Sequence, residues 1–189
     1  VGISGAFEKP RYNNNEELNH KSFVLSARFP SRIAKVTALE ATITDAKNLF
    51  KFTPELLGSY GPLAIESQYY YLTAKRENHL SNYKASGAYA IVRGLILGGH
   101  YSYSNADSGI ATPGPGSLEC VAGYNYTDMS DAKADIRGGR LNDVVVGLNY
   151  YINKYMIWRF RYSYTHVGNR AGVDNQSLNA FQTRLQILF

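Results

Sequence analysis

The chain has 189 residues, a formal net charge of +5, and an aromatic content dominated by tyrosine, with 16 Tyr against 8 Phe and 1 Trp. This length fits one domain, residues 1–189, and no apolar run reaches the roughly 18 residues of a membrane-spanning helix. The single cysteine, Cys120, excludes an internal disulfide, and the scattered positive charge argues against a nucleic-acid-binding patch.

The first predicted strand lies at the start of the chain. Residues 1–7 (VGISGAF) have a strand-like pattern, and no signal peptide is visible in them. Two origins fit this beginning: a processed mature protein, or the C-terminal part of a longer one. We expect the second, because no cap or lead-in comes before the strand.

Two-residue alternation of polar and apolar side chains runs along most of the chain and predicts an all-β protein. Helix signals are poor, because no capping box leads into a sustained 3.6-residue period. We expect about ten strands in all. The predicted strands cover residues 1–7, 23–29, 37–43, 50–60, 63–71, 83–99, 118–126, 144–152, 158–164 and 178–189.

The connections between these strands differ in length. Tight turns are predicted at 30–31, 61–62 and 153–154, and long polar loops at 9–21, 73–82, 128–140 and 167–177. Bacterial outer-membrane barrels combine short periplasmic turns with longer external loops, so this sorting predicts a transmembrane antiparallel β-barrel. The loop at 105–116 is an exception, because it falls at the short-turn end. A soluble β-sandwich has the same strand period but no reason to sort its loops.

The last strand shows the pattern most clearly. Phe181, Leu185 and Ile187 share one face with Thr183 and Phe189, whereas Gln182, Arg184 and Gln186 share the other. Such a strand suits a wall between lipid and water. The many tyrosines suit the same setting, because the ring is apolar and the hydroxyl is polar.

A charged side chain that faces lipid at mid-depth costs roughly 2–4 kcal/mol, so the charges on the strands should face a water-filled lumen. Arg159 and Arg161 are two residues apart and Arg184 lies on the adjacent strand, so we expect a cluster that attracts anions. In the alternative interpretation, the arginines pair with lumen glutamates and only brace the wall. The predicted lumen cations are Arg28, Lys51, Arg93, Arg159, Arg161 and Arg184, and the predicted acidic counter-charges are Glu40, Glu55, Glu66 and Glu119.

Two other classes of function are possible for a barrel of this size. An outer-membrane hydrolase would need Asp and His groups at the external rim, but no spacing in this chain marks a triad or a metal site. We therefore expect no catalysis, no metal and no cofactor. A non-conducting barrel that serves as a structural subunit of a larger membrane assembly is the other alternative. The residues weighed for catalysis are His79, His100, His166, Asp128, Asp131 and Asp174.

Several segments together resemble a known family. Residues 115–119 (PGSLE), 124–128 (YNYTD), 135–143 (DIRGGRLND) and 146–153 (VGLNYYIN) occur in an order and spacing similar to the C-terminal region of phosphate- and polyphosphate-selective porins, the porin O and P family. Glu55 followed by Tyr60-Gly61-Pro62 is similar to that family's glutamate and glycine-proline turn, and residues 95–99 match more weakly. The resemblance covers residues from about 50 to 189.

The resemblance implies a sixteen-stranded barrel in the outer membrane of a Gram-negative bacterium, of which this chain is the C-terminal part. It implies contacts with outer-membrane lipid, assembly as a homotrimer or larger complex, and a terminal Phe189 read by the barrel-assembly machinery. It also implies passive diffusion of small solutes, with anions such as phosphate as the expected substrates. No residue here matches the family's central phosphate ligands, which come largely from the N-terminal half of the barrel.

Overall fold

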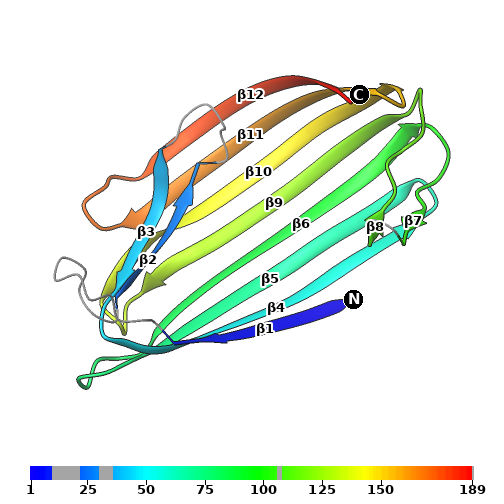
Figure 1. Ribbon diagram of the computed structural model, residues 1–189. Coiled ribbons are helices and arrows are strands. Elements are labelled where there is room, and N and C mark those ends of the chain that lie inside the picture. The colour runs from blue at the N-terminus through cyan, green and yellow to red at the C-terminus, as the bar shows by residue number, and fades with distance from the viewer. Residues whose placement is uncertain (10–21, 30–35, 106–107, 189) are drawn as a thin grey trace.

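The computed structural model describes residues 1–9, 22–29, 36–105 and 108–188. Its main element is one antiparallel sheet of eight strands in the order β1-β4-β5-β6-β9-β10-β11-β12, bent into a trough with both chain ends at the same end (Figure 1). The predicted all-β antiparallel class is confirmed, although β1 and β12 do not pair to close the sheet. The strands are β1 (Gly2–Glu8), β4 (Ala46–Tyr60), β5 (Leu63–Arg76), β6 (Tyr83–Leu97), β9 (Leu118–Asp131), β10 (Ile136–Asn153), β11 (Met156–Arg170) and β12 (Gln176–Ile187).

Two of the ten predicted strands do not belong to this wall. β2 (Phe23–Arg28) and β3 (Thr37–Ile43) form a separate antiparallel pair, which lies across the sheet at the end opposite to the chain termini (Figure 1). Their 6 and 7 residues fall short of the roughly 9–11 that a tilted strand needs to cross a membrane. The expectation that they cross the membrane as wall strands is therefore wrong; the predicted turn at 30–31 lies outside the described residues.

The β2–β3 hairpin packs on the wall through its own apolar face. Leu39, fully buried, packs with Leu141 and Val167 of β10 and β11. Ile43, also fully buried, belongs to a second cluster formed with Ala46, Leu49, Ala74, Tyr83 and Ala134. Alternation in these short strands thus reflects packing between two protein layers rather than a boundary with lipid.

A pair of glycines lets the hairpin approach β10 closely. A Cβ on Gly138 would lie 2.7 Å from Ala41 Cβ, and one on Gly139 would lie 2.8 Å from Leu39 Cδ2. Gly139 also has a φ of 100°, a conformation that favours glycine. The Arg170 side chain adds a polar anchor by donating from Nη1 to the Thr37 carbonyl at 2.7 Å. The paired glycines therefore serve the contact between hairpin and wall.

The connections are sorted by length less sharply than predicted. The turns at 61–62 and 154–155 are short, as expected, and those at 77–82 and 171–175 are longer. The predicted loop at 128–140 is wrong for most of its length, because β9 and β10 continue through it and leave only residues 132–135 as a turn. Its charges pair across the strands instead: Arg140 Nη2 lies 2.8 Å from Asp128 Oδ2. The exceptional connection between β6 and β9 contains the short strands β7 (Tyr103–Ser104) and β8 (Gly109–Ile110).

The side of the sheet away from the hairpin is exposed and apolar. Pairings such as Val144 with Tyr124 and Tyr164 place those side chains in one row across the sheet, and Tyr150 opposite Trp158 belongs to another row. The six-residue step along β10 between the rows is about 20 Å, close to the height of the apolar band on an outer-membrane barrel. The described residues contain no helix that is both long and apolar enough to span a membrane. Exposed apolar side chains on this side include Val92, Tyr124, Val144, Val146, Leu148, Tyr150, Trp158, Tyr162, Tyr164, Phe181, Leu185 and Ile187.

Candidate functional site

The opposite side of the sheet, called here the charged face, carries the strand charges. Strand register connects its residues directly: Glu119 lies opposite Asn149, Asn149 opposite Arg159, and Arg159 opposite Arg184. The β2–β3 hairpin packs on this same face, since Leu141 and Val167 share its phase. The sequence-predicted residues that the register places on the charged face are Lys51, Glu55, Glu66, Arg93, Glu119, Arg159, Arg161 and Arg184.

On β1, β4, β5 and β6 the cations of the charged face are paired with carboxylates. Arg93 Nη2 lies 2.5 Å from Glu66 Oε2, and the Tyr89 hydroxyl donates to Glu66 Oε1 at 2.9 Å. Lys51 Nζ lies 2.8 Å from Glu8 Oε1. The interpretation in which cations brace the wall through ion pairs therefore fits this part of the face.

Glu119 is satisfied by neutral groups instead. Glu119 is only 1% exposed, and the Tyr101 hydroxyl donates to its Oε1 at 2.6 Å. Asn149 Nδ2 and the Tyr151 hydroxyl donate to Oε2 at 2.6 and 3.1 Å. Both oxygens of this carboxylate are therefore occupied without a cation.

Asp143 on β10 is a second buried carboxylate. It is not among the predicted lumen residues, because the predicted strand begins one residue later, at 144, whereas β10 begins at Ile136. Asp143 is 1% exposed, and it accepts hydrogen bonds from Thr165 Oγ1 at 2.7 Å and Asn125 Nδ2 at 2.9 Å. Arg161 Nη2 lies 3.8 Å from its Oδ2, which is a loose ion pair. Continued two-residue alternation through residue 143 is the signal that identifies it as a wall residue.

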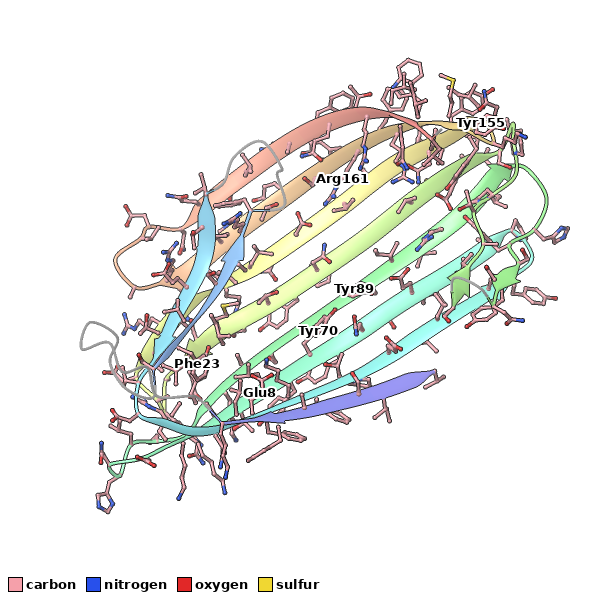
Figure 2. The ribbon with its side chains drawn as sticks, viewed as in Figure 1. Glu8, Phe23, Tyr70, Tyr89, Tyr155 and Arg161 are labelled. Carbon is pink, nitrogen blue, oxygen red and sulfur yellow. The ribbon has the colours of Figure 1, made fainter. Side chains whose placement is uncertain are left out.

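Arg159, Arg161 and Arg184 form a cluster on β11 and β12, called here the arginine cluster. Arg159 lies directly opposite Arg184, and Arg161 opposite Gln182; Figure 2 shows Arg161 on β11, separated by several strands from Tyr89 and Tyr70 on β6 and β5. Within the part of the chain that the structure describes, neither Arg159 nor Arg184 forms a salt bridge. The Nε atoms of Arg159 and Arg161 are buried without a hydrogen-bond partner.

Two predicted residues are not in the wall, and a third lies outside the described residues. Arg28 and Glu40 lie on the β2–β3 hairpin and are exposed on its side away from the wall, so their placement on barrel strands is wrong. Glu40 Oε2 is 3.9 Å from Arg170 Nη2 of β11. Phe189 lies outside the described residues.

The residues weighed for catalysis do not come together. His79 is exposed in the turn after β5 with a φ of 60°, and His100 is exposed in the connection after β6. His166 Nδ1 lies 3.0 Å from Ser177 Oγ, in the phase opposite to the charged face. No group of three or more His, Cys, Asp or Glu side chains in the described residues is arranged to hold a metal ion. Cys120 is exposed.

A bent antiparallel sheet with an exposed apolar side and a charged inner face is the wall of a porin-type β-barrel. The family model for phosphate-selective porin O and P matches residues 1–189, and the chain belongs to that family. The match confirms the predicted resemblance and extends it over the first 49 residues. No curated protein was found to match the chain. The family consists of channels rather than enzymes, and it locates the chain in the Gram-negative outer membrane, in contact with lipid.

Proposed function

We propose that this protein lets small anions, phosphate among them, diffuse passively through a water-filled lumen lined by the charged face. The observation that carries this proposal is the arginine cluster. In the described residues Arg159 and Arg184 form no salt bridge, and Arg161 lies 3.8 Å from Asp143. Glu119 and Asp143 beside them are buried and accept hydrogen bonds mainly from neutral donors. On this part of the charged face, Arg161 and Arg184 therefore reach solvent, whereas Glu119 and Asp143 do not.

Elementary electrostatics gives the size of the effect. Two unit charges about 4 Å apart in water interact by about 1 kcal/mol, which changes the local concentration of an ion roughly fivefold. A guanidinium also offers two parallel N–H donors to a phosphate oxygen pair, a geometry that ammonium lacks. The cluster therefore favours oxyanions over cations without binding them so tightly that passage stops.

We also propose that β1 and β12 pair with further strands in the assembled barrel. Unpaired backbone N–H and C=O groups at a sheet edge cannot be satisfied by lipid, so an open edge is not stable in hydrocarbon. The sixteen-stranded architecture implied by the family resemblance supplies such partners, with this chain as its C-terminal part. A homotrimer is the assembly that we expect, and cross-linking of the purified protein tests it.

The test is charge reversal at the arginine cluster. The whole protein is reconstituted in planar bilayers, and the reversal potential is measured in a potassium chloride gradient for wild type and for the double variant Arg159→Glu, Arg161→Glu. The wild type is expected to prefer chloride, added phosphate is expected to reduce the chloride current, and the double variant is expected to shift toward potassium.

Lys75→Glu with Lys133→Glu is the matched control. It makes the same change in total charge at exposed residues near the turns at the other end of the sheet, and it should leave the reversal potential near the wild-type value. Equal reversal potentials for wild type and the Arg159, Arg161 variant would contradict the proposal. Absence of any conductance in the wild type would favour the structural-subunit alternative.

A further inference from the structure

We propose that Tyr101 is a positioning residue for ion selectivity: its hydroxyl holds the Glu119 carboxylate away from Arg159, and this keeps Arg159 free for anions. The inference rests on the proposed function and names the group that maintains it. On the charged face, both oxygens of the buried Glu119 carboxylate accept hydrogen bonds from neutral donors. The nearby Arg159 has an Nε–H group without a hydrogen-bond partner.

Glu119 and Arg159 lie on the same row of the sheet with only Asn149 between them. Two strand spacings separate them by about 10 Å, a span that the long side chains of Glu and Arg can bridge, and a charge-assisted hydrogen bond is about twice as strong as a neutral one. Here Asn149 Nδ2 bonds to Oε2 from one side, and the Tyr101 hydroxyl bonds to Oε1 from another. The neutral donors thus fix the carboxylate in an orientation in which it forms no ion pair with Arg159.

Tyr101 comes from the connection between β6 and β9, and the backbone holds that connection in place. Tyr101 N donates to the Gly61 carbonyl at 2.9 Å. Further along, Gly116 N donates to the Tyr151 carbonyl at 2.6 Å, and Tyr151 N donates to the Ser117 carbonyl at 2.9 Å. These bonds attach the connection at both of its ends, so the side chain of Tyr101, 8% exposed, is delivered to one place.

A glycine at the start of the connection allows its two ends to lie close together. Gly98 has a φ of 122°, and a Cβ there would lie 2.5 Å from Ser117 Oγ. Only glycine fits where the two ends of the connection approach each other.

The Tyr101 hydroxyl keeps its proton. Burial, and next the hydrogen bond to Glu119, raise the pKa of Tyr101 well above its usual range. The hydroxyl therefore remains a donor at every pH at which the channel is measured.

Loss of the Tyr101 hydroxyl leaves Glu119 Oε1 buried without a donor, which is unfavourable for a carboxylate. A guanidinium can replace the lost donor: Arg93 on the adjacent strand is already paired with Glu66, whereas Arg159, in the same row as Glu119, has an unpaired Nε. Glu119 then forms an ion pair with Arg159 and removes one of the three cations of the cluster from the pathway. Total charge does not change, so any change in selectivity reports this rearrangement.

The experiment is Tyr101→Phe in the whole protein, measured as the chloride-to-potassium permeability ratio from reversal potentials. The change removes one oxygen and keeps the ring, and we expect the ratio to fall roughly twofold or more. Tyr103→Phe is the matched control, because Tyr103 is an exposed residue of the same connection, and it should keep the wild-type ratio. Tyr151→Phe removes the longer bond to Glu119 and should cause a smaller fall in the same direction.

A double-variant cycle separates positioning from a general loosening of the connection. In a Glu119→Gln background no carboxylate is present to pair with Arg159, so Tyr101→Phe should have no effect on the permeability ratio. A fall that persists in the Glu119→Gln background would overturn the inference, as would a Tyr101→Phe channel equal to wild type in an anion-selective protein. A wild-type channel without anion preference would overturn the proposed function itself, and this inference with it.

Discussion

Docking of the β2–β3 hairpin on the wall depends on Leu39, and truncation of this side chain should loosen the hairpin. Leu39 is fully buried between the hairpin and the wall, where it packs against Leu141 and Val167. A buried Leu→Ala change costs about 2–5 kcal/mol. A loss of about 3 kcal/mol in the docked state raises the undocked population roughly a hundredfold.

Val24→Ala provides the matched control for Leu39→Ala. Val24 belongs to the same hairpin but is 58% exposed, and a surface change of this kind costs less than about 0.5 kcal/mol. A nitroxide at Ser26→Cys, in a Cys120→Ala background, reports hairpin mobility by electron paramagnetic resonance, and single-channel recordings report current noise. We expect higher mobility and noise for Leu39→Ala only. Equal spectra and noise for the two variants would refute the view that this contact holds the hairpin in place.

Two further predictions concern the close contact at β10 and the outer face. Gly139→Ala should release the hairpin label as Leu39→Ala does, because its Cβ would lie 2.8 Å from Leu39 Cδ2; Gly172→Ala, with a positive φ but open space around it, should not, and equal effects of the two would show that backbone strain alone is responsible. Trp158, the single tryptophan, is 44% exposed on the apolar side, so lipids brominated on their acyl chains should quench its fluorescence. Quenching by aqueous iodide instead would place this face in water.

The wall strands were predictable because each of their faces meets one kind of environment. In β12, Phe181, Leu185 and Ile187 lie opposite outer residues of β11, whereas Gln182 and Arg184 lie opposite Arg161 and Arg159. Two-residue periodicity predicts which side chains share a face of such a wall, because a shift of one residue would move every side chain to the opposite face. The phase, and with it the shared face of the charged residues, follows from the sequence alone.

The hairpin shows where periodicity is insufficient. Leu39 and Ile43 alternate with polar residues as a wall strand does, but they are buried against protein. Alternation indicates that one face of a strand is apolar, but it does not indicate whether protein or lipid covers that face. Strand length was the missing criterion, since β2 and β3 are too short to span the apolar band. The predicted loop at 128–140 is wrong for a related reason: charged residues occur in strands as well as in loops, and β9 and β10 continue through most of this segment.

Of the three residues that donate hydrogen bonds to Glu119, Tyr101 cannot be predicted from the sequence. Asn149 and Tyr151 share its face through strand pairing, which the phase of β10 predicts in principle. Tyr101 reaches it from an irregular connection, and the path of such a segment depends on backbone bonds to Gly61 and to the neighbouring turn. No local pattern encodes those long-range contacts, so the predicted list of lumen charges did not separate covered carboxylates from accessible cations.

The carboxylates of the charged face have different partners on its two sides, so positive charge is distributed unevenly across it. Glu66 neutralises Arg93 on the β5–β6 side, whereas Glu119 and Asp143, both 1% exposed, are covered and bonded mainly by neutral groups on the β9–β11 side. Arg161 beside them has a side chain that is 39% exposed. Because Arg161 and Arg184 reach solvent and can contact an ion directly, we expect the positive potential along this wall to be strongest beside β11 and β12. Anions that follow the wall should therefore pass along those two strands, and we expect neutral donors such as Tyr101, which bonds to Glu119, to help keep the potential there positive.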